Sequence, residues 1–203
     1  MKSGKQFGVS LVEVMTTVAV MALLAAFAAP NVQKMLQNNR TESVATQLQN
    51  SLYLARSDAA KTGYRTTFCP VGSDQNSCGT DYSNGWIIFS DHNDNGVLDS
   101  TPVADTNGDG VTNALDDTES VLFVYNNDSA QFKITMVDDD NAAGVPDANQ
   151  AFRYYPNGMS SLRNRKNPKL TIIHSQSQSL AASIRFEQSG RIHLCITARD
   201  GHC

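Results

Sequence analysis

Oxygen-bearing side chains recur between residues 105 and 116 at the spacing of a calcium-binding loop. Asp, Asn, Asp, Asn and Asp occupy loop positions 1, 3, 5, 9 and 12, and a glycine at position 6 permits the sharp turn. A backbone carbonyl serves at position 7. The last carboxylate is Asp instead of Glu, which shortens its reach. The predicted ligands are Asp105, Asn107, Asp109, Val111, Asn113 and Asp116.

A second, incomplete copy of the same pattern precedes the first. It offers Asp91, Asn93, Asn95 and Asp99, but Pro102 stands where the last carboxylate would fall. This copy is therefore the weaker calcium candidate. For both segments the alternative is an acidic loop or polar turn without metal. Any calcium here would be structural, and the pattern predicts no catalytic cofactor.

The chain lacks the motifs of the common enzyme classes. It contains no phosphate-binding glycine loop, no G-x-S-x-G elbow and no H-E-x-x-H pair, so we expect it not to be an enzyme. Transition metals are also disfavoured, because the histidines show no ligand spacing. The four histidines are His92, His174, His193 and His202.

The predicted secondary structure of the chain begins with an N-terminal membrane helix. Residues 9–29 contain one ionisable side chain, Glu13, and 21 apolar or small polar residues are enough to cross a bilayer as a helix. Lys2 and Lys5 precede this segment, which predicts that the leader stays inside and the bulk of the chain outside. A buried carboxylate costs about 3 kcal/mol in such a helix, so Glu13 needs a partner.

The four cysteines form two close pairs in the sequence. An even number of cysteines in an exported chain predicts disulfide bonds, and we favour Cys69 with Cys78 and Cys195 with Cys203. Three connectivities are formally possible, and reduced thiols remain the alternative if the chain is not exported.

An α+β fold follows from the remaining pattern. Apolar residues at helical spacing continue the first helix over residues 30–62, where Gly63 can end it. Short β-rich runs follow, separated by turn residues such as Pro156-Asn157-Gly158 and Ser189-Gly190. We expect antiparallel sheets against the amphipathic half of the helix. The predicted strands are 64–69, 85–90, 120–125, 131–136, 151–155, 170–174, 182–187 and 191–197.

The N-terminal run K-Q-F-G-V-S-L-V-E-V-M resembles the signature of prepilins. The resemblance implies cleavage between Gly8 and Val9, N-methylation of Val9, and a filament-assembly role for Glu13, whose carboxylate meets an N-terminal amine. Pro30 falls where pilins carry a helix-bending proline, and the hydrogen bond that it removes predicts a kink there. Val9 replaces the Phe that is commonest after the cleavage site, which leaves the required glycine unchanged.

The head resembles the GspH/FimT family of minor pseudopilins and type IV minor pilins. Three features carry the likeness: Cys69 and Cys78 ahead of the run from Asn84 to Asp91, then the run from Asn93 to Asp99, and finally the run from Ser189 to Cys195. Residues 101–117 look like an insertion. The resemblance implies a pilin-like fold and a structural role in a type IV pilus or a type II secretion pseudopilus, in filament priming, tip assembly and protein secretion.

DNA capture in natural transformation is the alternative function. Some relatives bind DNA through a C-terminal Gly-Arg-x-Arg segment, and here Gly190-Arg191-Ile192-His193 lacks the second arginine. DNA is therefore a possible but disfavoured partner, because affinity for phosphate rises with the number of cations. The candidate contacts are Arg191, Arg163, Arg165 and Lys166.

Four segments are thus expected along the chain. They are a prepilin leader (1–8), a transmembrane helix (9–29), an amphipathic continuation (30–62) and a β-rich head (63–203). The expected location is the inner membrane of a Gram-negative bacterium, with one span and a periplasmic head, and afterwards a pilus or pseudopilus. The expected partners are other pilins, a prepilin peptidase and the inner-membrane assembly platform.

Overall fold

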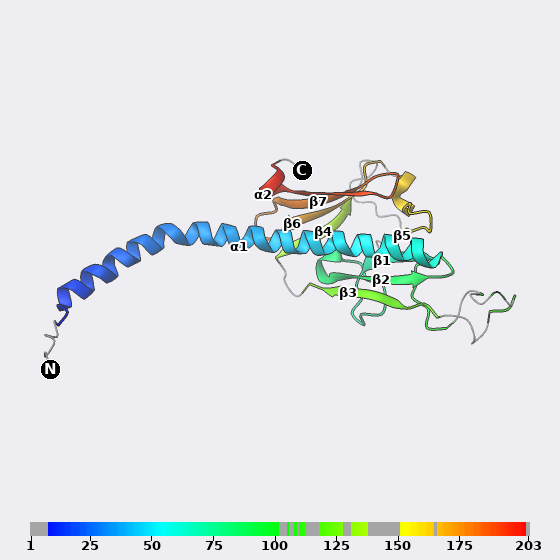
Figure 1. Ribbon diagram of the computed structural model, residues 1–203, viewed down its shortest axis with the longest axis horizontal. Coiled ribbons are helices and arrows are strands. Elements are labelled where there is room, and N and C mark those ends of the chain that lie inside the picture. Colours follow the sequence, from blue (N-terminus) through cyan, green and yellow to red (C-terminus); the bar gives the residue numbers. More distant parts are fainter. Residues whose placement is uncertain are drawn as a thin grey trace, which may run out of the picture. The chain divides into compact units, whose positions relative to one another are not determined.

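The fold consists of one long helix and two antiparallel sheets (Figure 1). The computed structural model describes residues 8–101, 105, 108, 110–112, 118–127, 131–137, 151–164 and 166–201, without the side chains of 27–30 and 163–164. The chain divides into two compact units, Met1–Arg40 and Thr41–Cys203. Helix α1, Leu11–Thr62, contributes residues to both of them.

In the first unit, α1 exposes its apolar side chains. Leu11, Met21 and Leu24 are each 65% exposed or more, and the residues between them are exposed as well. Val32 and Met35, expected on the buried face of the helix, are also more than half exposed. The amphipathic face before Arg40 therefore has no packing partner within this unit.

In the second unit, the last part of α1 belongs to the hydrophobic core. Its buried residues repeat every three or four positions, which places them on one face of the helix. Leu48 and Leu52 are completely buried at the centre of this face. The helix ends at Thr62, and Gly63 follows with a positive φ of 78°. The buried face comprises Val44, Ala45, Leu48, Leu52, Ala55 and Ala59.

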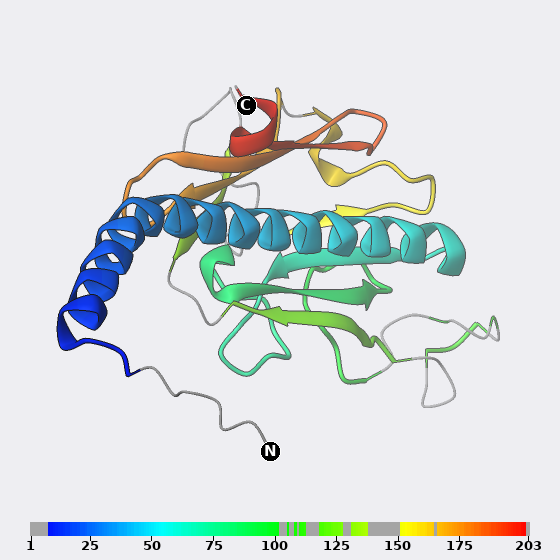
Figure 2. The same cartoon turned by 60° about the vertical axis from the view of Figure 1, so that its left-hand side comes forward.

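The first sheet has the strand order β3-β2-β1-β5. Strand β1 (Arg65–Pro70) pairs on one side with β2 (Gly85–Asp91) and on the other with β5 (Phe152–Tyr154). Strand β3 (Val121–Asn126) pairs with β2 and is the outermost strand of this sheet (Figure 2). A register shift between Ile88 and Phe89 marks a bulge opposite the start of β3.

The second sheet has the order β4-β6-β7-β8. It contains β4 (Phe132–Val137), β6 (Lys169–His174), β7 (Leu180–Phe186) and β8 (Ile192–Ile196), all antiparallel. Two short 3-10 helices, η1 (Tyr82–Asn84) and η2 (Ser161–Asn164), and a final helical turn, α2 (Thr197–Asp200), complete the described elements.

Both sheets and α1 contribute to one core of apolar side chains. Aromatic rings fill its centre, with Phe68 and Phe152 at 5.1 Å and Phe152 and Phe186 at 5.1 Å between centroids. The single tryptophan, Trp86, is fully buried and stacks on Tyr125 at 4.2 Å. The α+β, pilin-like fold expected from the sequence is confirmed, since a long N-terminal helix packs on antiparallel strands.

Candidate functional site

The predicted processing segment precedes the first helical turn. Gly8, Val9 and Ser10 are exposed and non-helical, and α1 begins at Leu11. The Ser10 carbonyl accepts hydrogen bonds from the amides of Glu13 (3.0 Å) and Val14 (3.2 Å), which starts the helix. No atom lies within 4 Å of the position that a Cβ on Gly8 would take, so the bond between Gly8 and Val9 is open to an enzyme. Residues 1–7 of the predicted leader lie outside the described residues.

Glu13 lies on the exposed surface of the first helical turn. Among the described helices, none is by itself long and apolar enough to cross a membrane. The segments Leu11–Ala26 and Asn31–Thr62 meet the criteria of length and composition together, with a 42° bend between them. Pro30 falls at this bend, and its side chain is outside the described residues, so its assignment as the cause of a kink stays a prediction.

The second predicted calcium loop, residues 91–99, is held together by internal hydrogen bonds. Asp91 is completely buried, and its two oxygens accept hydrogen bonds from the amides of Asn95 (3.1 Å) and Gly96 (3.0 Å). Asp99 Oδ2 accepts from the side-chain amides of Asn95 (2.8 Å) and Asn93 (3.2 Å). All four predicted ligands thus lie in one loop, where both oxygens of Asp91 and Oδ2 of Asp99 already accept hydrogen bonds.

An arginine from β5 supplies the positive charge beside this loop. Arg153 Nε lies 3.3 Å from Asp91 Oδ2 and 3.4 Å from Asp94 Oδ1. Thr67 Oγ1 donates a further bond of 2.6 Å to Asp91 Oδ2. Gly96 adopts a positive φ of 73°, and a Cβ there would meet Arg153 Nη2 at 2.5 Å. The arrangement therefore fits a calcium ion poorly, because Arg153 already neutralises Asp91.

Glu119 holds loop 91–99 in place and was missed by the sequence pattern. Its carboxylate accepts hydrogen bonds from the amides of His92 (2.8 Å) and Asp99 (2.8 Å), the two ends of the same loop. Burial raises the pKa of Glu119, the two hydrogen bonds oppose that rise, and the negative charges of Asp91 and Asp99 add to it. Because Glu119 is 20 residues from Asp99, loop spacing could not reveal it.

Only part of the first predicted calcium loop is described. Asp105 accepts hydrogen bonds from the amides of Gly108 (2.7 Å) and Gly110 (2.8 Å), as the first residue of a tight polar turn does. Val111 is also described, whereas Asn107, Asp109, Asn113 and Asp116 lie outside the described residues. Over the described part of the chain, no three His, Cys, Asp or Glu side chains are placed to hold a metal. Calcium binding stays a prediction.

One of the two predicted disulfides is present. Cys69 and Cys78 are bonded, with their Cα atoms 5.6 Å apart, and join the end of β1 to the following loop. The second pair, Cys195 with Cys203, cannot be described because Cys203 lies outside the described residues.

Of the four predicted DNA contacts, Arg191 and Lys166 have described side chains. Arg191 is exposed beside Glu187, and Glu187 Oε1 lies 2.7 Å from His193 Nε2. The hydrogen bond from His193 lowers the pKa of Glu187, which favours a negative charge at this turn. Lys166 is exposed, while Arg165 and the side chain of Arg163 are outside the described residues.

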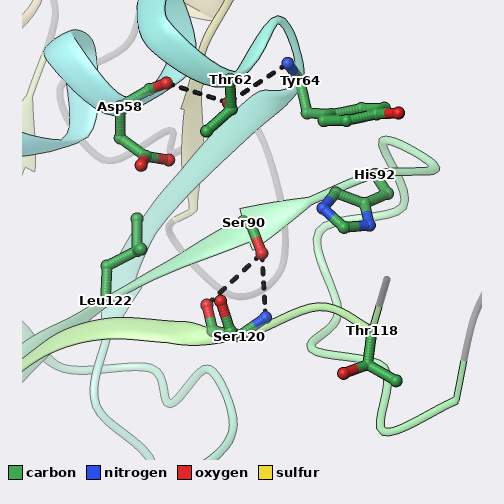
Figure 3. Close-up of a pocket in the computed structure, with 8 residues that line it drawn as sticks. All are labelled: Asp58, Thr62, Tyr64, Ser90, His92, Thr118, Ser120 and Leu122. Carbon is green, nitrogen blue, oxygen red and sulfur yellow. Dashed lines mark hydrogen bonds between the residues drawn. The ribbon is translucent and has the colours of Figure 1, made fainter. Parts of the chain in front are cut away.

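A pocket of about 470 Å³ opens between the end of α1 and the start of β3 (Figure 3). Asp58 and Thr62 of α1 form one wall, and Ser90, Ser120 and Leu122 face them. His92 packs against Tyr64 at 4.5 Å between ring centroids and closes one side. Among the described residues that line the pocket, Asp58 is the only carboxylate and there is no Lys or Arg.

Residues 44–201 match the protein family described as Type II transport protein GspH. The match covers most of the chain and all the strands described above. This chain belongs to the GspH family. Among curated proteins, none matches the sequence. Family membership confirms the resemblance inferred from the cysteine pair and from the two flanking head motifs.

Two solved structures are similar in fold to this GspH-family chain. The type IV minor pilin FimU of Pseudomonas aeruginosa is 17% identical, with a TM-score of 0.49, and the match covers 80% of this chain and 93% of FimU. The minor pseudopilin EpsH from the type 2 secretion system of Vibrio cholerae is 11% identical, with a TM-score of 0.43 and coverage of 78% and 98%.

The GspH family consists of structural proteins, not of enzymes. The chain therefore has the structural role of a minor pilin or pseudopilin, in association with other pilins of a filament. Membership also implies a membrane-anchored protein of the periplasmic pilus or pseudopilus.

Proposed function

We propose that this GspH-family chain is made as a prepilin, cleaved after Gly8 and inserted through residues 9–29 as a single inner-membrane span. Its head then lies in the periplasm until the chain enters a filament. The observation that carries the proposal is the combination of Gly8 and Glu13 at the start of a 52-residue helix. The exposed, non-helical Gly8–Val9 bond supports processing by a prepilin peptidase.

The chemistry of assembly centres on Glu13 and the amine of Val9. Cleavage creates this amine four residues before Glu13, and methylation of its nitrogen keeps the positive charge. A subunit entering the filament can then place its amine against a Glu13 carboxylate, which removes the cost of burying either charge alone. The inner-membrane assembly platform would drive this extraction, and the apolar residues 9–26 would become filament core.

Processing is tested by the mass of the N-terminal peptide. Full-length protein recovered from membranes of its own host should begin at Val9 and carry one added methyl group on its nitrogen. Replacing Gly8 by Val should leave the leader attached, whereas replacing Gly4 by Val should not. An intact leader in the unaltered protein, or cleavage at another bond, would reject the proposal.

We further propose a role in priming or at the tip of the filament, in a type IV pilus or a type II secretion pseudopilus. Sheared surface filaments and cross-linked membranes should be analysed by mass spectrometry for proteins that accompany the mature chain. Recovery with a major pilin assigns the chain to a type IV pilus. Recovery only with secretion pseudopilins assigns it to the secretion machine and to protein export.

A further inference from the structure

The outer edge of β3 differs from the other three sheet edges. On β4, β5 and β8, at least one outward amide is bound by a side-chain oxygen. Ile134 N donates to Ser83 Oγ (3.1 Å), Arg153 N to Ser161 Oγ (3.0 Å) and Ile196 N to Asp200 Oδ2 (2.8 Å). Such caps prevent an edge from pairing with another chain.

On β3, the register shows which backbone groups face outward. Asn127 N donates to Asn84 O, and this pair is in register with Trp86–Tyr125 and Ile88–Phe123. The alternation of antiparallel pairing therefore directs the backbone N–H and C=O of Val124 and Asn126 away from β2. No partner for these groups occurs among the described residues.

The side chains of β3 also lack the usual protection of an edge strand. The sequence Val121-Leu122-Phe123-Val124-Tyr125-Asn126 contains no charge, proline or glycine, and Val121 is 37% exposed. A strand of this kind favours addition of an extended segment from another chain, through main-chain hydrogen bonds.

The pocket beside Leu122 defines a side chain that such a segment would carry. Asp58 Oδ2 accepts a hydrogen bond from Thr66 Oγ1 (2.9 Å), which leaves Oδ1 as the oxygen that can accept a bond from an incoming side chain. His92 Nδ1 is a buried atom without a hydrogen-bond partner in the described part of the chain. A mostly polar pocket that contains a carboxylate, and no Lys or Arg among its described lining residues, is complementary to a lysine or arginine side chain.

We propose that β3 is a docking edge for an extended segment of a neighbouring filament subunit, which pairs with β3 and seats a Lys or Arg side chain against Asp58. This inference rests on the proposed filament role. A single six-residue strand forms a far smaller interface than the roughly 1,200–2,000 Å² that stable independent complexes bury. A partner held in the same filament overcomes this limit, because its effective concentration is high.

Photo-cross-linking of the full-length chain in membranes of its own host tests the docking edge. A benzoylphenylalanine at Asn126 should cross-link to one pilin-type protein, through a peptide that contains a lysine or arginine. The same probe at Lys133, an exposed position on β4, is the control and should give at most about a tenth of that yield. Cross-linking to an exported protein, or equal yields at the two positions, would overturn the proposal.

Two substitutions separate backbone pairing from the charge in the pocket. Val124→Pro removes one outward N–H and should lower the cross-link about tenfold, while Val124→Thr keeps the N–H and should not. Asp58→Asn still accepts from Thr66 but removes the charge, and should lower the yield, in contrast to Glu42→Gln on the exposed face of α1. Unchanged yields in Val124→Pro and Asp58→Asn would also overturn the proposal.

Folding and processing are measured in the same samples. The Cys69–Cys78 disulfide reports a folded head, and if Val124→Pro loses it, Asp58→Asn alone decides the result. The N-terminal mass reports the proposed function independently. A chain that begins at Val9 and enters filaments without the β3 cross-link rejects only the docking edge, whereas an unprocessed chain rejects the filament role itself.

Discussion

At the scale of single residues, the polar groups of loop 91–99 are fixed by partners from distant strands. Arg153 comes from β5 and Glu119 from the segment before β3, and each binds the loop from a different side. The polar residues of the loop were recognised from their spacing in the sequence. Their partners were not, because pairing between strands far apart in sequence has no local signature.

Arg153→Met should be the most destabilising substitution around this loop. It leaves the fully buried carboxylate of Asp91 without its ion pair, and breaking such a pair costs about 3–5 kcal/mol. Arg65→Met is the matched control, because the Arg65–Asp94 pair is partly exposed and such pairs contribute roughly 0–1 kcal/mol. Urea unfolding followed by Trp86 fluorescence compares them, and equal losses would contradict the expected order.

Glu119→Gln should change how stability depends on pH. The raised pKa means that the contribution of Glu119 is fully present below its unfolded pKa and is lost as pH rises through the folded value. The stability advantage of the unaltered protein over Glu119→Gln should therefore shrink as pH rises from about 4 to about 7. Unfolding midpoints at several pH values measure it.

Glu187→Gln is a control for which the expected pH dependence of stability is opposite. The pKa of Glu187 is lowered, so its contribution is present above the unfolded pKa and is lost as pH falls through the folded value. The advantage over this variant should grow as pH rises. If both advantages changed in the same direction with pH, the environment inferred for Glu119 would be wrong.

At the scale of elements, all eight strands and the long helix were predictable from the sequence. The helix was expected over residues 9–62 and is found at Leu11–Thr62, and the strand boundaries agree within a few residues. Periodicity and turn residues act locally, which is why they succeed. The division into two sheets was not predicted, because it depends on pairing between strands far apart in the sequence. The final turn α2 was also not predicted, because it depends on a hydrogen bond from the Ile196 amide to Asp200 Oδ2.

Gly190→Ala should disrupt the turn between β7 and β8. Gly190 has a φ of 75°. A Cβ added there would overlap the carbonyl oxygen of Gly158, so the two turns would have to separate. Gly201→Ala shares the positive φ of 86° but meets no atom within 4 Å. We expect a loss of about 1 kcal/mol for Gly201→Ala and clearly more for Gly190→Ala. Thermal unfolding distinguishes them, and equal losses would exclude a close approach of the turns.

At the scale of the whole molecule, the GspH-family head needs both sheets and the last part of α1 for one core. The family and fold class were predictable from the N-terminal motif, the cysteine pair and the two head motifs. Whether the protein belongs to a type IV pilus or to a secretion pseudopilus was not predictable. That choice depends on partners, and partners recognise surfaces that arise only on folding, such as the proposed docking edge of β3.

Glu13→Ala should separate membrane insertion from assembly. The substitution leaves a more apolar segment, so the chain should stay in the membrane, but it removes the carboxylate that we propose meets the N-terminal amine. We expect at least about a tenfold loss from purified filaments. Glu42→Ala on the same helix is the control. Quantitative mass spectrometry of membrane and filament fractions measures the ratio, and normal incorporation of Glu13→Ala would contradict the assembly role.

Because α1 continues into the core of the head, a pull on its N-terminal end would act as a mechanical load on that core. The load reaches the face that carries Leu48 and Leu52, where it acts as shear across many buried contacts at once instead of peeling strands one by one. In the proposed extraction from a bilayer, the head would therefore resist unfolding, because these buried contacts would have to break together.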